Sequence, residues 1–199
     1  MDRFVDLLAS LVHETGIPDA AVFRKRKIEL PGFYRPTKEW DMLTVVDDDL
    51  LAAVELKSHV GPSFGNNFNN RTEEAIGSAV DVWTAFREGA FGDSPRPWLG
   101  YVLLLEDCEE SRIPVSVREP HFKVFEEFRE ASYQKRYELL CRKLMRERHY
   151  EAAAFITSPR EDDITGTQIR WSREIAKSAF ISGPKKLARK TRGCAFVMQ

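Results

Sequence analysis

The stretch 40–57 constrains the fold most, because it consists of two short apolar segments joined by three consecutive aspartates. Residues 42–46 and 51–56 are almost wholly apolar and partly β-branched, a composition that favours strands. The aspartates at 47–49 favour a turn. We therefore predict an antiparallel hairpin that is closed by a three-residue loop centred on Asp48.

Counted outward from that loop, the hairpin places Asp41 opposite Glu55. Directly opposed residues share a face, with Cβ atoms about 5 Å apart, and the two-residue period of a strand puts Lys57 on the same face. Two carboxylates this close repel each other unless a cation lies between them. Mg²⁺ prefers carboxylate oxygens, and a lysine beside it can orient or deprotonate a metal-bound water. The pattern therefore predicts a Mg²⁺ site for hydrolysis.

A plainer interpretation stays open for the same three residues. An acidic-x-Lys triplet arises by chance in many chains, although Glu55-Leu56-Lys57 is the only one in this sequence. Under this interpretation Asp41 and Glu55 are solvated charges at strand ends, and Lys57 is a salt-bridge partner of little energetic weight.

The chain has 199 residues, 43% of them hydrophobic and 31% charged, which is typical of a globular protein with a substantial core. We expect one domain over 1–183 and a basic, mobile tail over 184–199. The sequence contains neither an apolar run long enough to span a membrane nor a secretory signal, so we expect a cytoplasmic protein without membrane contact. Cys108, Cys141 and Cys194 are odd in number and widely separated, which argues against a disulfide framework.

Charge is distributed unevenly along the chain, although the net charge is only −1. Residues 21–40 carry six Lys or Arg against two acids, and residues 129–149 carry seven against three. Residues 41–70 invert this pattern, with five acids and one lysine. An acidic centre between basic segments suits a metal site that also holds a polyanion such as DNA. Such runs are also common on solvated helix faces.

Two segments near the hairpin are candidates for DNA contact. We expect 33–39 to be a loop that delivers Arg35 and Lys38 to phosphates near the carboxylates. Residues 58–70 are rich in Gly, Pro and Asn and predict an ordered loop. Its four asparagines are Asn66, Asn67, Asn69 and Asn70. Asparagine can pair with adenine in the major groove, but in a turn it can equally bond its own backbone.

Apolar periodicity predicts the remaining elements. We expect helices over 2–15, 72–89, 132–148 and 170–180, and strands over 20–30, 98–105 and 152–157. Thr72 is expected to cap the second helix, whose buried stripe would be Ile76, Ala79, Val80, Trp83 and Phe86. The sequence thus predicts an α/β fold in which a mixed central sheet is flanked by helices.

Six motifs together resemble the XhoI-type restriction endonucleases of the PD-(D/E)xK nuclease superfamily, over about residues 20–160. They are Phe-Tyr-Arg-Pro-Thr-Lys (33–38), Trp-Asp (40–41), Val-Glu-Leu-Lys-Ser (54–58), Gly-Pro-Ser-Phe-Gly-Asn-Asn-Phe-Asn-Asn-Arg-Thr-Glu-Glu-Ala-Ile-Gly (61–77), Trp-Thr-Ala-Phe-Arg-Glu-Gly-Ala-Phe-Gly (83–92) and Pro-His-Phe-Lys-Val-Phe (120–125). The sequence departs from the superfamily pattern at Trp40, where a proline is usual, and it has less sequence before the first helix than family chains.

The resemblance implies a restriction-endonuclease-like core and a Mg²⁺-dependent type II enzyme that cuts double-stranded DNA at a palindrome, CTCGAG in that family. It implies a homodimer, because identical subunits then meet identical half-sites, and a cognate DNA methyltransferase as functional partner. Asp41 and Glu55 match the metal-binding acids and Lys57 the catalytic lysine.

Further site residues follow less directly from the resemblance. The backbone carbonyl of Leu56 is expected to join the metal ligands, and Glu14 on the first helix is a candidate third carboxylate. Arg71, within the asparagine-rich motif, is expected to bind DNA. Two other functions stay open, a DNA-binding module that has lost catalysis and a structure-selective nuclease such as a junction resolvase.

Overall fold

The computed structural model describes residues 2–159. The expected helix over 170–180 and the expected tail over 184–199 lie outside these residues. The helices are α1 (Asp2–His13), α2 (Phe64–Arg87), α3 (Glu109–Arg112) and α4 (Tyr133–Arg146), with short 3-10 helices at Asp19–Ala21 and Glu126–Phe128. The strands are β1 (Val22–Phe23), β2 (Glu29–Pro31), β3 (Thr37–Glu39), β4 (Met42–Val46), β5 (Asp49–His59), β6 (Trp98–Glu106) and β7 (Ala152–Ser158).

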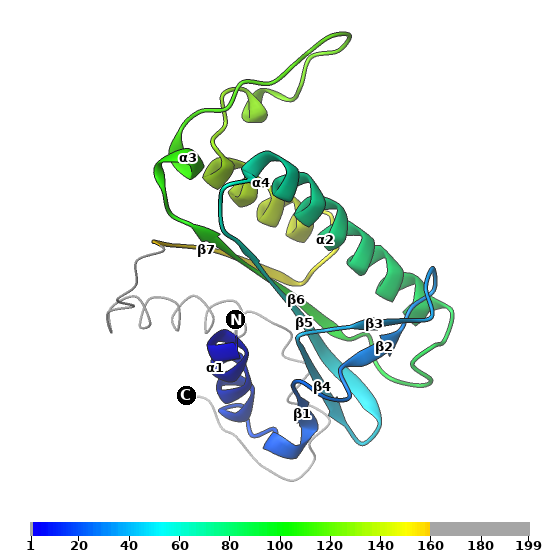
Figure 1. Ribbon diagram of the computed structural model, residues 1–199. Helices are drawn as coiled ribbons and strands as arrows, with labels where there is room; N and C mark the ends of the chain where they lie inside the picture. Colours follow the sequence, from blue (N-terminus) through cyan, green and yellow to red (C-terminus); the bar gives the residue numbers. More distant parts are fainter. Residues whose placement is uncertain (1, 160–199) are drawn as a thin grey trace, which may run out of the picture.

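The central sheet has five strands in the order β1-β4-β5-β6-β7. Strand β4 is antiparallel to both β1 and β5, whereas β5, β6 and β7 run parallel. Parallel neighbours need a crossover connection, and α2 connects β5 to β6 while α4 precedes β7 (Figure 1). The predicted α/β fold with a mixed sheet is confirmed.

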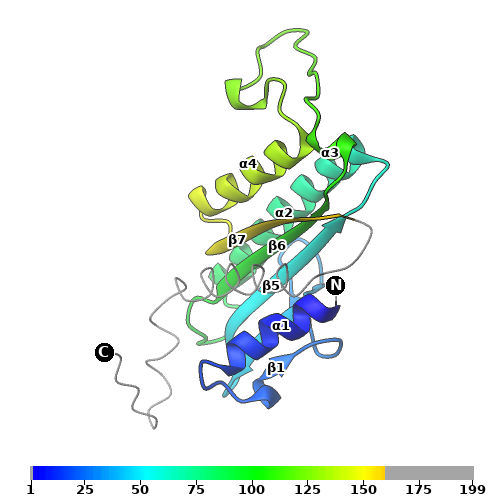
Figure 2. The same cartoon turned by 90° about the vertical axis from the view of Figure 1, so that its left-hand side faces the viewer.

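Helices cover both faces of the sheet. Helices α2 and α4 lie side by side on one face, and α1 lies on the other (Figures 1 and 2). Alternate residues of β5 pack on opposite faces of the sheet. Ala53 packs with the cluster under α2 and α4, whereas Val54 and Leu56 pack with Leu8 of α1. Because side chains alternate along a strand, Glu55 and Lys57 face the α2 and α4 side.

The hairpin turn is one residue shorter than the sequence predicted. Val46 pairs with Asp49, so the connection has only two residues, Asp47 and Asp48, at φ 51° and 64°. Two successive left-handed residues make the primed turn that matches strand twist. The predicted three-residue loop is therefore wrong.

An irregularity within the hairpin restores the predicted register nearer the site. The pairing shifts by one residue between Thr44 and Val45, so that Met42 pairs with Val54. Such a bulge places one extra residue on one strand. Extending the pairing by one position brings Asp41 opposite Glu55, as the sequence predicted.

The segment 20–30 is not one strand. Only β1 and β2 are extended, and between them the basic run makes a tight turn in which Lys25 and Lys27 have φ of 71° and 55°. The segment expected to be a loop over 33–39 contains β3, which pairs with β2 from Glu29↔Glu39 to Pro31↔Thr37. This second, two-stranded sheet is the β2–β3 hairpin, which lies near the C-terminal end of α2 (Figure 1).

Helix α2 begins eight residues before the predicted cap, so the loop expected over 58–70 is wrong. Phe64 and Phe68, one turn apart, pack into the cluster under α2 and α4, and ring centroids lie 5.5 Å apart for Phe64 and Tyr133 and 5.0 Å for Phe68 and Tyr137. This aromatic packing outweighs the weak helix propensity of asparagine and glycine. Thr72 lies inside the helix and donates to the carbonyl of Phe68 at 2.8 Å.

The predicted stripe of α2 is correct at Ala79 and Trp83 but wrong at Ile76 and Val80, which are 39% and 36% exposed. The elements after α2 agree with the prediction. Strands β6 and β7 lie where expected, and Ser132 caps α4 by accepting from the backbone amide of Lys135 at 3.2 Å.

Between α3 and α4 the chain forms a projecting arm, 113–131, that extends away from the sheet (Figure 1). Phe122 in this arm is 88% exposed. None of the helices within 2–159 combines the length and the apolarity that crossing a membrane would require.

Gly100 in β6 allows a test of core packing, because a Cβ atom there would lie 2.5 and 2.7 Å from two ring carbons of Trp98. We expect Gly100→Ala to lower the free energy of unfolding by about 1–3 kcal/mol through overpacking. Gly77→Ala on α2, where a Cβ meets nothing within 4 Å, should raise it by about 0.5–1 kcal/mol. Urea unfolding measures both, and an unchanged Gly100→Ala protein would contradict the packing described.

Candidate active site

Asp41 directly precedes β4. Both its backbone and its side chain make hydrogen bonds to the neighbouring strand, β5. Its amide donates to the carbonyl of Val54 at 3.1 Å, and its carboxylate Oδ2 accepts from the backbone amide of Leu56 at 2.7 Å. The second carboxylate oxygen makes neither of these bonds. The hairpin therefore presents a half-buried carboxylate with one oxygen available beside Glu55.

Glu55 is the most enclosed acid of the site, with 4% of its side chain exposed. Two lysines share its carboxylate: Lys38 Nζ lies 2.6 Å from Oε2, and Lys57 Nζ lies 2.5 Å from Oε1. The predicted convergence of Asp41, Glu55 and Lys57 is thus present, with a second lysine added. Two carboxylates and two ammonium groups leave the cluster with no net charge.

The pKa of Asp41 is raised above its ordinary value. Burial is the main cause, and the negative charge of Glu55 adds to it. The amide of Leu56 acts in the opposite direction, as do the charges of Lys57 and Lys38. A bound cation would stabilise the ionised form of such a carboxylate, because it offsets both the burial and the charge of the second acid.

Lys38 comes from outside the central sheet, on β3. Its side chain is 12% exposed, and its ammonium also donates to the carbonyl of Glu39 at 2.7 Å. The ammonium lies 4.5 Å from the ring centroid of Trp40, which is itself 1% exposed. The sequence suggested a phosphate contact for Lys38, whereas the structure directs this ammonium into the acidic pair.

A buried aspartate on α2 anchors the β2–β3 hairpin. Asp81 accepts from the backbone amides of Phe33 and Tyr34 at 2.7 and 2.9 Å, and from Arg35 Nε at 2.6 Å. Burial alone would raise the pKa of Asp81, but these bonds from Tyr34, Arg35 and Phe33 hold that pKa below its ordinary value. Sequence reasoning missed Asp81, although an acid flanked by apolar residues on an amphipathic helix was the available signal.

The residues fit a magnesium ion that is held largely by water. Within 2–159 there is no cluster of three or more His, Cys, Asp or Glu side chains that would bind a metal. Mg²⁺ commonly needs only one or two protein carboxylates beside waters and phosphate oxygens. In a strand the N–H and C=O of one residue point the same way, so the carbonyl of Leu56 faces the edge where its amide meets Asp41.

Glu14 is the candidate third carboxylate from the sequence. It follows the last residue of α1 and is exposed. The buried side of α1 packs with Val54 and Leu56, on the face of the sheet opposite to Glu55.

The four asparagines lie on the first two turns of α2, and all but the half-buried Asn67 are exposed. Arg71 follows them and pairs with Glu74 at 2.6 Å. Helix α2 starts just after β5 ends at His59, which is four residues beyond Glu55. The strand from Glu55 to His59 covers roughly 13 Å at about 3.3 Å per residue, and residues 60–63 connect it to α2.

His59 is a structural residue, as lone histidines usually are. It is 2% exposed, and its Nδ1 lies 2.7 Å from the hydroxyl of Tyr137. Burial is the main reason that its pKa is lowered. The ring of His59 also lies 4.8 Å, centroid to centroid, from that of Phe64, so His59 connects the end of β5 to α4 and to the start of α2.

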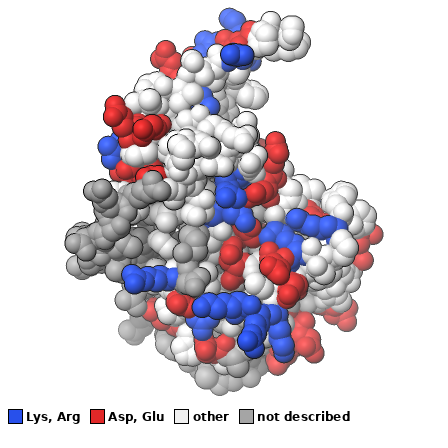
Figure 3. All heavy atoms as spheres, in the orientation of Figure 1, with Lys and Arg blue, Asp and Glu red and all other residues white. Residues whose placement is uncertain are grey.

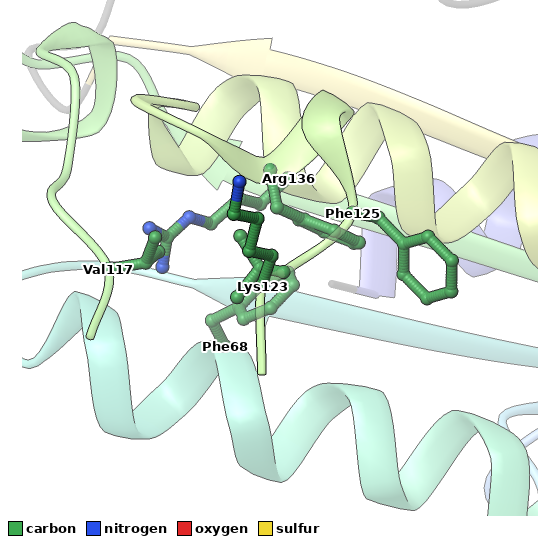
Figure 4. Close-up of a pocket in the computed structure, with 7 residues that line it drawn as sticks. Phe68, Val117, Lys123, Phe125 and Arg136 are labelled. Carbon is green, nitrogen blue, oxygen red and sulfur yellow. The ribbon is translucent and has the colours of Figure 1, made fainter. Parts of the chain in front are cut away.

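The surface near the site carries both signs of charge. In the view of Figure 3, Lys and Arg lie beside Asp and Glu over the sheet rather than in one basic face. A hollow of about 330 Å³ lies between α2, α4 and the projecting arm, and is lined by Phe68, Val117, Lys123, Val124, Phe125, Phe128 and Arg136 (Figure 4). None of the acids or lysines of the site lines it, so this hollow is separate from the acidic pair.

A mixed sheet that bears an aspartate before one strand and Glu-x-Lys on the next defines a restriction-endonuclease-like α/β core. The chain belongs to the XhoI restriction endonuclease family, whose model, described as restriction endonuclease XhoI, matches residues 1–170.

Curated relatives support this assignment. Type II restriction enzyme BstVI from Geobacillus stearothermophilus is 56% identical over 171 residues, 83% of this chain and 76% of that enzyme. Type II restriction enzyme XhoI from Xanthomonas vasicola is 56% identical over 147 residues, 73% of this chain but only 59% of that enzyme. This chain therefore spans less than two thirds of the XhoI enzyme. No solved structure matches it.

The raised pKa of Asp41 gives a prediction about stability. Above that pKa the ionised carboxylate is disfavoured in the folded state, so Asp41→Asn should raise the thermal unfolding midpoint at pH 8 by up to a few degrees. The amide oxygen of the variant can still accept from Leu56. The difference should shrink as the pH falls toward the pKa of Asp41, because the wild-type carboxyl then takes up a proton.

Differential scanning calorimetry of the metal-free protein at pH 8 and pH 5 measures this difference. Exposed Asp93→Asn serves as the control and should leave the midpoint within about one degree at both pH values. A lower midpoint for Asp41→Asn at pH 8 would show that the charge of Asp41 stabilises the fold.

Proposed function

We propose that this chain is a Mg²⁺-dependent type II restriction endonuclease that hydrolyses phosphodiester bonds of double-stranded DNA at a palindromic site. The observation that supports it most is the convergence of Asp41 and Glu55 from adjacent strands with Lys57 at Glu55 Oε1. The family expectation for the site is CTCGAG.

Asp41, Glu55 and the carbonyl of Leu56 would hold the magnesium ion. When bound, the ion supplies a water of lowered pKa and offsets the charge that builds on the scissile phosphate. Lys57, on the same face as Glu55, would donate to the attacking water and hold it in line with the leaving oxygen. The products would then carry 5′-phosphate and 3′-hydroxyl ends.

The start of α2 would read the DNA. Exposed asparagines can make bidentate contacts with adenine in the major groove, and Arg71 can bind a phosphate. Arg35, with 44% of its side chain exposed, would contact phosphates from the β2–β3 hairpin.

Further parts of the proposal follow from a palindromic target and from the family. Two copies of the chain would form a two-fold dimer. A methyltransferase that modifies the same site would be its functional partner, and both would act in the cytoplasm. Glu14 would be the third carboxylate of the metal site.

Plasmid cleavage tests the proposal and its rivals together. We expect the wild-type chain to give discrete fragments with Mg²⁺ and none with EDTA. Asp41→Ala and Glu55→Gln should each lower the cleavage rate by about 10²–10³-fold, as removal of a charge-stabilising group does. Binding without cutting would instead support a DNA-binding module, and cutting only at branched DNA would support a resolvase. Exposed Asp93→Asn should cut like wild type.

The asparagine contacts predict a loss of sequence preference. With Ca²⁺ replacing Mg²⁺, we expect Asn66→Ala and Asn70→Ala to weaken binding to the preferred duplex by about 1–3 kcal/mol, with little change for a scrambled duplex. Arg71→Met should weaken both duplexes alike, because a phosphate contact carries no sequence information. Fluorescence polarisation measures each affinity. If the asparagine variants lost the same affinity for both duplexes, these residues would contact the DNA backbone instead of the bases.

A further inference from the structure

The two lysines on Glu55 differ in how firmly they are held. Lys38 has three partners, namely Glu55 Oε2, the carbonyl of Glu39 and the ring of Trp40, and its side chain is 12% exposed. The ammonium of Lys57 pairs with Glu55 Oε1, and its side chain is 26% exposed. When a metal needs an oxygen of Glu55, Lys57 is therefore the easier ammonium to displace.

The carboxylate of Asp41 is bound to the amide of Leu56, the residue between Glu55 and Lys57, and so lies beside both of them. An ion shared by Asp41 and Glu55 would displace the less firmly held ammonium, that of Lys57, from Oε1. Oε2 would remain with Lys38.

The support of Lys38 is itself fixed. The β2–β3 hairpin is tied to α2 through the three bonds to Asp81, and Gly32 at its tip lies so close to Asp81 that a Cβ atom would be 2.7 Å from Oδ2. Lys38 therefore approaches Glu55 from an element anchored independently of β5.

We propose that Lys38 is a positioning residue of the metal centre, which binds Oε2 of Glu55 so that Oε1 is left for the ion. In the metal-free protein the ammonium of Lys57 occupies the position beside Oε1 that the ion would take. This inference rests on the proposed function. Groups that orient a metal ligand in this way typically contribute 10–100-fold to metal affinity or activity.

The two lysines should then have opposite effects on metal binding without DNA. We expect Lys38→Met to weaken Mn²⁺ binding about tenfold or more, although removal of a positive charge by itself favours a cation. Lys57→Met should bind Mn²⁺ as well as wild type or better, because a competitor is gone. The electron paramagnetic resonance signal of free Mn²⁺ measures both affinities, and exposed Lys27→Met controls for the loss of one charge.

Lysine reactivity in the wild-type protein tests the same inference without a variant. On addition of Mn²⁺, acetylation of Lys57 should increase while Lys38 stays protected, as read by mass spectrometry. Increased labelling of Lys38, or Mn²⁺ binding by Lys38→Met that equals or exceeds wild type, would overturn the inference.

A separate outcome identifies failure of the proposed function. If wild-type protein binds no Mn²⁺, or Glu55→Gln binds it equally well, the metal site itself is refuted and this inference with it. Thermal unfolding of each variant establishes that the protein compared is folded.

Discussion

The burial of Glu55 is the constraint on which the rest of the site depends. An ionised carboxylate that is removed from water costs several kcal/mol unless charges and hydrogen bonds compensate it. Here two ammonium groups from different elements lie within 2.6 Å of its two oxygens. The β2–β3 hairpin and its anchor at Asp81 bring one of these ammonium groups, that of Lys38, to this side chain.

The same contacts bear on the proposed metal site, which has few protein ligands. The carboxylate of Asp41 is held by the amide of Leu56, and that of Glu55 is held by Lys38, so both acids have a set orientation. Ligands oriented in this way would suit an ion that keeps several of its waters, as Mg²⁺ does.

Much of this arrangement was predictable from local pattern. The pairing of Asp41 with Glu55 was predicted from two apolar runs and a turn signal, and strands β6 and β7 from their apolar runs. The loop of that hairpin was predicted one residue too long, and the bulge restores the register. The early start of α2 was not predictable, because Gly and Asn disfavour helices and only packing of Phe64 and Phe68 against α4 decides the outcome. The pairing of Lys38 with Glu55 was missed for a related reason. It depends on the pairing of β3 with β2, and strands of three residues are too short to produce a recognisable sequence pattern.

The hairpin carries a two-residue turn and a one-residue bulge whose effects on register cancel. The bulge therefore keeps Glu55 on the side of α2 and α4 although the turn has only two residues. If Leu51 entered the regular ladder instead of bulging, every later position of β5 would change face and Glu55 would point toward α1. One irregularity of the backbone thus decides which layer of the molecule receives the acid of the site.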